Sequence, residues 1–226
     1  MPAPYLAVLF DFDYTLGDAS GGIVDCVNFA LQGMGMPPAP EVDIRRTVGM
    51  SLPTCFATLT GDCTPARVPA FVRLFTERAD QVMLGGTRLF PTVAAMLGAL
   101  AGAGLRLGIV STKFHRRLEQ ITQRDGVRPF FAILVGGDDV PAPKPDPTGL
   151  LQAAVALGAG PRQCLYVGDS TVDGETARRA GVDFAAVLTG ATPASDLEAY
   201  RPVAILSAVS ELPGLLLPRS GPMGCP

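Results

Sequence analysis

The chain has 226 residues, and its 18 basic and 21 acidic side chains give a formal net charge of −3. This length accommodates one large domain or a core domain with an insert. The slight acidic excess argues against nucleic acid or an anionic membrane surface as the main partner. Glycine, proline or a charged residue interrupts every apolar run before it could span a bilayer, so no membrane partner is expected.

The cysteines and the first residues indicate a cellular location. The five cysteines are an odd number with no Cys-x-x-Cys spacing, which predicts neither a disulfide framework nor a zinc site. No basic segment precedes the first apolar run, so a secretory signal is not expected. We therefore expect a cytoplasmic protein.

The first apolar run, residues 6–10, ends at Asp11 and Asp13, and Thr15 follows. A short run without polar alternation is typical of a strand buried on both faces of a parallel sheet. Ligands bind at the carboxyl ends of such strands. Two carboxylates this close must take up a proton or share a cation. The simpler alternative is an Asp-rich turn after a strand.

Residues 17–87 have a helical pattern with no strong strand. Apolar residues recur at helical spacing from Ile23 to Met34, and again from Phe71 to Val82. Gly35 and the prolines after it end the first of these helices. We expect an all-helical cap domain at 17–87, inserted into a core domain formed by 1–16 and 88–226.

Strands and helices alternate after Pro91. The predicted strands are 105–110, 130–135, 164–167 and 182–188, with a further edge strand at 204–206. Helices are expected from Pro91 to about 101, at 114–124, from the proline-rich loop 141–147 to 157, and up to 180. This order predicts an α/β fold, a Rossmann-like parallel sheet flanked by helices. The Pro- and Gly-rich tail from Pro213 is expected to be a surface loop or extension.

Four polar groups follow these strands. They are Asp11 with Asp13, Ser111 with Thr112, Lys144, and Asp169 with Asp173. Each has a simpler interpretation, because Thr112 could cap a helix, Lys144 could be a solvated loop residue, and Ser170 with Asp173 matches a capping box. A parallel sheet would nevertheless bring all four groups to the same edge.

Together these groups suit phosphoryl transfer. The transferred group is anionic and needs cations and hydrogen-bond donors around it. A carboxylate can act as the nucleophile by forming an acyl phosphate. Ligation by carboxylate oxygens suits Mg²⁺. The expected partner is therefore a small phosphorylated substrate.

In order and spacing, the four groups resemble the motifs of haloacid dehalogenase-type phosphatases over residues 5 to 190. The resemblance implies that Asp11 is the nucleophile and a metal ligand. It implies that Asp13 is the general acid and then the base, with its backbone carbonyl on the metal. Asp169 would complete the Mg²⁺ site, and Asp173 and Thr15 would support it.

The same resemblance assigns the phosphate contacts. It implies that Ser111 holds a phosphate oxygen, with Thr112 beside it, and that Lys144 offsets the negative charge. Only Lys113 and Lys144 are lysines in this arginine-rich chain, and both lie beside motif residues. We also expect Arg45 or Arg46, which precede a loop that resembles the cap loop meeting the active site, to bind a substrate anion. A solvated helix face is the alternative for this pair.

The insert position resembles the subgroup that contains phosphoglycolate phosphatases. The strings Leu89-Phe90-Pro91, Ser111-Thr112-Lys113 and Lys144-Pro145-Asp146-Pro147 look like that subgroup. The chain departs from the family at Tyr14, where many members have glycine, and in having Ser-Thr in place of Thr-Asn at 111–112. We expect Tyr14 to face the region between core and cap.

Other branches of the family fit less well. Dehalogenases lack the second aspartate of the first motif, whereas Asp13 is present. Phosphonate-cleaving members need a cap lysine, and no lysine occurs before residue 113. Mutases place histidine in the cap, and the only histidine is His115. Phosphoglycolate is the leading substrate, with other small phosphomonoesters or pyrophosphate as alternatives. A non-catalytic phosphate sensor and any oligomeric state stay open.

Overall fold

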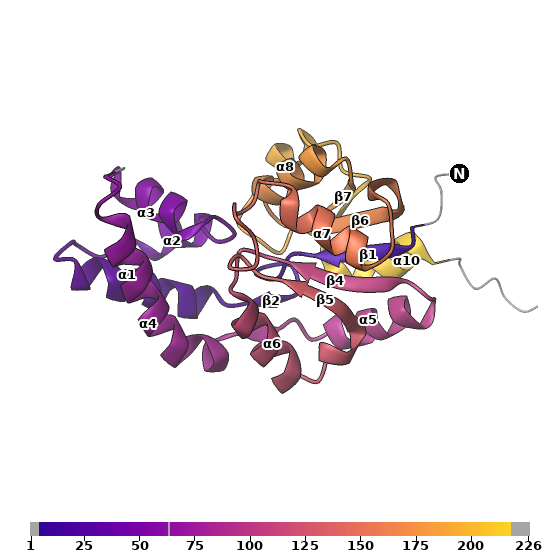
Figure 1. Ribbon diagram of the computed structural model, residues 1–226, viewed down its shortest axis with the longest axis horizontal. Helices are drawn as coiled ribbons and strands as arrows, with labels where there is room; N and C mark the ends of the chain where they lie inside the picture. Colours follow the sequence, from indigo (N-terminus) through magenta and orange to yellow (C-terminus); the bar gives the residue numbers. More distant parts are fainter. Residues whose placement is uncertain (1–4, 63, 218–226) are drawn as a thin grey trace, which may run out of the picture.

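A six-stranded parallel sheet forms the centre of the protein in the computed structural model, which describes residues 5–62 and 64–217 (Figure 1). Its strand order is β5-β4-β1-β6-β7-β8. The bounds are β1 Ala7–Phe10, β4 Arg106–Val110, β5 Phe131–Val135, β6 Cys164–Gly168, β7 Asp183–Val187 and β8 Ala204–Leu206. All neighbours pair in parallel, which confirms the predicted α/β fold, including the edge strand.

Helices cover both faces of this sheet. Val8 and Phe10 of β1 join a buried cluster with α5 (Val93–Gly102), α6 (His115–Arg124) and α10 (Leu212–Leu216). Ala7 and Leu9 join a second cluster with α7 (Thr148–Ala156), α8 (Thr171–Ala180) and α9 (Ala194–Glu198). Because both faces of β1 are buried, its sequence is apolar without alternation. Short 3₁₀ helices lie at Arg128–Phe130, Pro161–Gln163 and Val209–Glu211.

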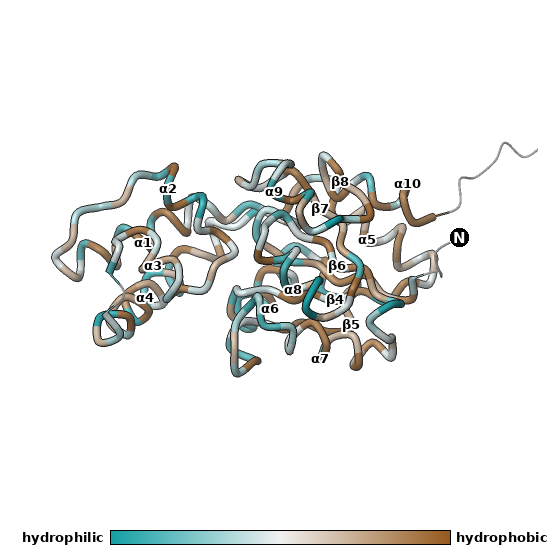
Figure 2. Tube along the Cα trace, turned by 90° about the horizontal axis from the view of Figure 1, so that it is seen from above, coloured by the Kyte–Doolittle hydropathy of each residue, from teal (hydrophilic) through white to brown (hydrophobic). Residues whose placement is uncertain are grey.

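A second unit consists of α1 (Ser20–Gly33), α2 (Glu41–Arg46), α3 (Leu52–Thr60) and α4 (Val68–Gly86). Its buried apolar cluster takes all its members from between residues 19 and 83. Phe71 contacts both Phe56 and Phe75, with ring centroids 5.1 and 6.2 Å apart. Figures 1 and 2 show this helical unit at one end of the molecule and the sheet at the other.

The chain passes between the two units along a short antiparallel ribbon. Its strands are β2 (Gly17–Asp18) and β3 (Arg88–Leu89), and Gly17 pairs with Leu89. A Cβ at Gly17 would lie 2.7 Å from the Arg88 carbonyl oxygen, so the ribbon requires a residue without a side chain there. We propose that the domains divide at this ribbon, into a core of 1–16 with 88–226 and a helical cap of 17–87.

The expectation of a loop from Pro213 is wrong for the first residues of the tail. Leu212–Leu216 forms α10, with Pro213 in its first turn, where proline is compatible with a helix. Leu212 is fully buried in the sheet cluster, and this burial stabilises the turn. The rest of the tail from residue 218, Cys63, Cys225 and residues 1–4 lie outside the described residues. Within the described ranges, no helix has the length and apolarity needed to cross a membrane.

Candidate active site

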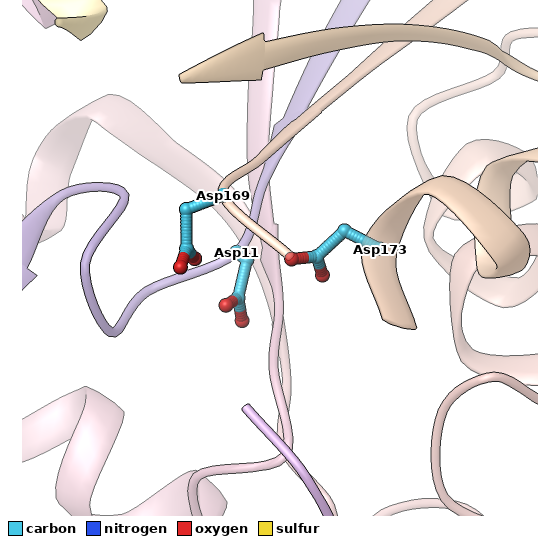
Figure 3. Close-up of side chains that lie close together, drawn as sticks. All are labelled: Asp11, Asp169 and Asp173. Atoms are coloured by element: carbon cyan, nitrogen blue, oxygen red, sulfur yellow. The ribbon is translucent and has the colours of Figure 1, made fainter. Parts of the chain in front are cut away.

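The predicted polar groups meet at the carboxyl edge of the sheet. β1 lies between β4 and β6, and Phe10 pairs with Ile109 on one side and with Val167 on the other. Asp11, Ser111 and Asp169 therefore emerge from three adjacent strand ends. Carboxylate oxygens of Asp11, Asp169 and Asp173 lie within 4.8 Å of one another, and Figure 3 shows the side chains converging. All three are buried, so their charges are poorly solvated.

Lys144 reaches into this cluster from the loop between β5 and α7. Its Nζ lies 2.9 Å from Asp11 Oδ1 and 2.6 Å from Asp173 Oδ1. Only 5% of its side chain is exposed, so it is not the solvated loop lysine of the simpler interpretation. Burial lowers the pKa of Lys144, but attraction by Asp11 and Asp173 outweighs it and leaves the pKa well above the ordinary value. The site thus contains a fixed positive charge.

Asp173 caps α8 and also holds Lys144. The Ser170 hydroxyl accepts a hydrogen bond from the Asp173 backbone N–H, and Asp173 Oδ2 accepts bonds from the Ser170 N–H and hydroxyl, at 3.1 and 2.6 Å. The capping-box interpretation is therefore confirmed, and it coexists with a place in the cluster. Because its other oxygen accepts from Lys144, Asp173 is committed to protein partners.

Asp11 has much less hydrogen bonding than Asp173. Neither of its buried oxygens accepts a well-directed hydrogen bond from the described residues, although the Lys144 ammonium lies near Oδ1. Burial, together with repulsion from Asp173 and Asp13, raises the pKa of Asp11 to about 6, while Lys144 acts in the opposite direction. A buried carboxylate in this condition requires a cation or a proton.

Asp169 is similarly short of partners. Its Oδ1 accepts one long hydrogen bond, 3.3 Å, from the Thr15 hydroxyl. Burial first, and then repulsion from Asp173 and Asp11, raise its pKa well above the ordinary value. The unsatisfied oxygens of Asp11 and the weakly bonded Asp169 form an all-oxygen donor set, which fits the expected Mg²⁺. The third carboxylate of the cluster belongs to Asp173. Asp13, which was expected to contribute its backbone carbonyl to the metal, has no carboxylate oxygen in the cluster.

Asp13 pairs with the second lysine of the chain. Lys113 Nζ lies 3.1 Å from Asp13 Oδ2, and the two side chains are 2% and 9% exposed. The other oxygen of Asp13 has no partner among the described residues. Lys113 was noted in the sequence for its rarity, but its partner could be found only in the fold. Each lysine of the protein therefore neutralises one carboxylate of the first motif.

Ser111 and Thr112 follow β4, as expected. The Ser111 hydroxyl is buried and accepts a 3.3 Å hydrogen bond from the Lys113 N–H. Thr112 does not cap α6, whose N-cap residue is Phe114. Its hydroxyl instead donates a 3.4 Å hydrogen bond to the Gly49 carbonyl. Thr112 thus connects the sheet edge to the loop that follows α2 in the helical unit.

Tyr14 and Arg45 meet across the two units. Tyr14 has φ 61°, in the left-handed region that favours glycine, which is the residue the family motif often has there. Its hydroxyl lies 3.3 Å from Arg45 Nη1, so Tyr14 does face the helical unit. Arg45 also bonds Ser20 and Glu41, and Arg46 is exposed beside Asp43. That either arginine binds a substrate anion stays a prediction.

Two residues of the site were not predicted from the sequence. The Tyr166 hydroxyl on β6 donates to the Val110 carbonyl at 2.8 Å and lies 3.1 Å from Lys144 Nζ. A tyrosine inside an unbroken apolar strand was a usable signal, since a buried hydroxyl needs a partner. At Gly190, a Cβ would lie 1.9 Å from Asp169 Oδ2, so only glycine fits. Nothing in the sequence around Gly190 indicated this contact.

Comparison with known proteins agrees with this geometry. The family model of haloacid dehalogenase-like hydrolases matches residues 8–187. Phosphoglycolate phosphatase of Escherichia coli K12 is 32% identical over 235 positions, covering 94% of this chain and 93% of the relative. A solved haloacid dehalogenase-like hydrolase of Bacteroides fragilis is 40% identical, with a TM-score of 0.89 over 92% of this chain and 99% of that one.

A solved structure from Haemophilus somnus 129PT, described as a predicted phosphoglycolate phosphatase, has the same fold. Its TM-score is 0.83 at 23% identity, over 93% of this chain and 97% of that chain. The resemblance inferred from the four motifs is confirmed. The chain is therefore a phosphatase that belongs to the haloacid dehalogenase-like hydrolases.

Proposed function

We propose that the protein is a Mg²⁺-dependent phosphomonoester hydrolase that works through an aspartyl-phosphate intermediate on a small phosphorylated metabolite. The observation that supports this most strongly is the pairing of a buried, poorly bonded Asp11 with the Lys144 ammonium 2.9 Å away. A nucleophilic carboxylate must be free of tight hydrogen bonds, and a phosphoryl group needs a fixed cation beside it.

The proposed reaction has two steps. Asp11 attacks phosphorus and forms an acyl phosphate, while Asp13 gives a proton to the departing alcohol oxygen. Water then attacks the acyl phosphate and gives its proton to Asp13, which releases inorganic phosphate and restores Asp11. Ser111 would hold a phosphate oxygen, and Lys144 would offset charge throughout. Lys113, at 3.1 Å from Asp13, would keep that carboxyl in position.

The metal would be held by Asp11, Asp169 and the backbone carbonyl of Asp13. Bound there, Mg²⁺ would offset negative charge between the carboxylates and the phosphoryl group. Asp173 would position Lys144, and Thr15 would orient Asp169 through its 3.3 Å hydrogen bond. Thr112 would lie beside the phosphate contacts.

Phosphoglycolate is the first substrate to test, because curated relatives carry the name phosphoglycolate phosphatase. Other small phosphomonoesters and pyrophosphate are the alternatives. We also propose a cytoplasmic location, with which the buried free thiols of Cys26, Cys55 and Cys164 agree.

Hydrolysis of p-nitrophenyl phosphate, with Mg²⁺ or with EDTA, tests this function. We expect turnover that requires Mg²⁺ and is lost in Asp11→Asn but unchanged in Asp196→Asn, which alters an exposed aspartate on α9. Acid-quench labelling with a ³²P-phosphorylated substrate should trap label on the wild-type protein only. Equal activity of Asp11→Asn and wild type would reject the proposal, and so would an absence of turnover on every phosphorylated metabolite tried.

A further inference from the structure

A cavity of about 310 Å³ lies between the sheet edge and the helical unit. Asp13, Thr112 and Lys113 contribute to its lining from the sheet side, and the loop at residues 47–51 contributes from the helical side. Most of the remaining lining is apolar. It includes Ile23, Leu52, Val72, Phe75, Met83 and Val140.

The cavity adjoins the proposed general acid, not the metal cluster. Asp13 belongs to its lining, whereas Asp11, Asp169 and Asp173 do not. In the proposed reaction, Asp13 passes its proton to the oxygen of the departing alcohol. The alcohol portion of the substrate must therefore occupy the space beside Asp13, which is this cavity.

The cations in the wall are already paired with carboxylates. Lys113 pairs with Asp13, and Arg117 pairs with Asp80 at 2.9 Å while it also donates to the Thr76 carbonyl. The buried Nε of Arg117 has no acceptor among the described residues. Arg45 and Arg46 are not in the lining. A carboxylate placed in this cavity would therefore meet little free positive charge.

The size of the cavity leads to the same conclusion. A water molecule occupies about 30 Å³ in the liquid, so the volume of the cavity corresponds to roughly ten water molecules. Glycolate would leave much of this volume unfilled. An apolar group gains affinity with each methylene that it moves out of water into such a lining.

We propose that the preferred substrates are phosphomonoesters of apolar alcohols, alkyl or aryl, that are larger than glycolate. This inference rests on the proposed phosphatase function, since that function identifies the cavity as the place of the departing alcohol. The observations behind it are the residues that line this cavity.

Binding of n-alkylphosphonates, which cannot be hydrolysed as esters, tests the cavity independently of turnover. Calorimetric titrations of the Mg²⁺-loaded protein should show affinity rising about two- to fourfold per methylene from ethyl- to hexylphosphonate. Hexylphosphonate should bind more tightly than 4-phosphonobutyrate, a ligand of similar size that ends in a carboxylate. A flat series overturns the proposal, and so does tighter binding of the carboxylate through Arg117.

Val72→Trp fills the cavity from α4, and Val155→Trp makes the same change on the exposed face of α7. Val72→Trp should remove most of the rise in affinity from ethylphosphonate to hexylphosphonate, while the affinity for ethylphosphonate is retained. Val155→Trp should leave the affinities for the whole series unchanged. If a folded Val72→Trp protein still bound hexylphosphonate more tightly than ethylphosphonate by the wild-type factor, the alkyl chain would lie elsewhere, and the proposal would be overturned.

Turnover separates this inference from the function on which it rests. Hexyl phosphate should be hydrolysed with at least tenfold higher kcat/KM than phosphoglycolate. Rising phosphonate affinity without hydrolysis of any ester would reject the phosphatase function and keep the apolar pocket. Faster hydrolysis of phosphoglycolate than of hexyl phosphate would keep the function and reject the substrate class.

Discussion

The sheet edge and the helical unit are stabilised by opposite means. At the sheet edge, four buried carboxylates, Asp11, Asp13, Asp169 and Asp173, face only two ammonium groups, Lys113 and Lys144. The helical unit is held by an apolar cluster around Phe56, Phe71 and Phe75, which gains free energy simply by excluding water. The sheet edge gathers charged groups that chemistry requires, and their burial lowers its stability. The helical unit is stabilised by burial of apolar side chains, and it forms much of the wall of the proposed substrate cavity.

Polar links between the two regions lie in two places. Near the sheet edge, Thr112 bonds the Gly49 carbonyl, and Tyr14 contacts Arg45. Between α6 and α4, Arg116 and Arg117 form salt bridges with Asp80, and Arg117 and Arg124 donate to the Thr76 and Leu84 carbonyls. If the regions have separate tasks, changes at the sheet edge should alter rate constants, and changes in the helical cluster should alter stability and substrate choice.

The largest effect is expected from Asp13→Asn. Hydrolysis of an alkyl phosphate should fall about 10²–10⁴-fold, because the alkoxide must then leave without a proton. The loss in the first step should be much smaller for p-nitrophenyl phosphate, whose leaving group needs no proton. Rapid quench should then show a burst of p-nitrophenol before slow turnover. Equal losses with both esters in the first step would contradict the acid role.

Phe71→Ala should be the most damaging change in the helical unit. Removal of this fully buried ring should cost about 3–5 kcal/mol of unfolding free energy in urea titration. Hydrogen exchange should quicken in α1 and α4 before the amides of β1 are affected, because the aromatic cluster does not include the sheet. Val155→Ala, at an exposed site, is the control. Uniform loss of protection would show that the two regions unfold as one.

Lys113→Met tests the coupling between the second lysine and Asp13. General acid–base catalysis contributes about 10²–10⁴-fold, and loss of the buried ion pair that positions the acid should remove part of it, so kcat should fall by roughly ten- to a hundredfold. Lys113→Arg should recover part of the loss. KM for p-nitrophenyl phosphate should change much less than kcat if Lys113 acts through Asp13. An altered KM with unchanged kcat would instead make Lys113 a substrate contact.

Asp169→Asn should stabilise the metal-free protein. It replaces a buried carboxyl group that has no lysine partner with a neutral amide. Burial and the neighbouring carboxylates raise the pKa of Asp169, which means that they disfavour its charged form. In EDTA at neutral pH, we expect a gain of about 1–2 kcal/mol, or several degrees in Tm. The same variant should lose the stabilisation by Mg²⁺ and the Mg²⁺-dependent activity. A lower Tm in EDTA would show that the carboxylate is stabilised in ways that the geometry does not reveal.

The smallest expected effect is a pH dependence of metal-free stability. The pKa of Asp11 is about 6 in the folded protein against an ordinary 3.8, so the folded state binds this proton more tightly. Its contribution is therefore complete below about pH 4 and is lost as pH rises through about 6. In EDTA, unfolding free energy should fall from pH 5 to pH 7 by on the order of 1 kcal/mol. Mg²⁺ should reduce this fall, and Asp11→Asn should make it smaller, with Asp169, whose pKa is also raised, contributing the remainder.

Several features could be read from the sequence because local pattern determines them. The unbroken run at residues 6–10 predicted a strand buried on both faces, and Val8 and Leu9 do pack into opposite clusters. The capping box at Ser170 and Asp173 was recognisable from spacing alone. That Asp173 also holds Lys144 required the loop after β5 to fold across the sheet edge.

Other features had no local signature. Burial of Leu212 against the sheet converts a Pro- and Gly-containing stretch into α10, overriding its turn-like composition. The contact between Gly190 and Asp169 joins the residues that follow two different strands. Arg45 contacts Tyr14 and Ser20, which lie 31 and 25 residues away in the sequence. In each case the deciding partner is distant in the chain.

The sequence by itself determined the α/β class, the order of strands and helices, and the residues able to carry phosphoryl chemistry. It could do so because apolar periodicity and motif spacing are properties of neighbouring residues. Only the tertiary structure decided which charge meets which: Lys144 with Asp11 and Asp173, Lys113 with Asp13, and no lysine with Asp169. It also decided the apolar wall beside Asp13, because a cavity exists only where segments far apart in sequence pack around a space that they leave unfilled.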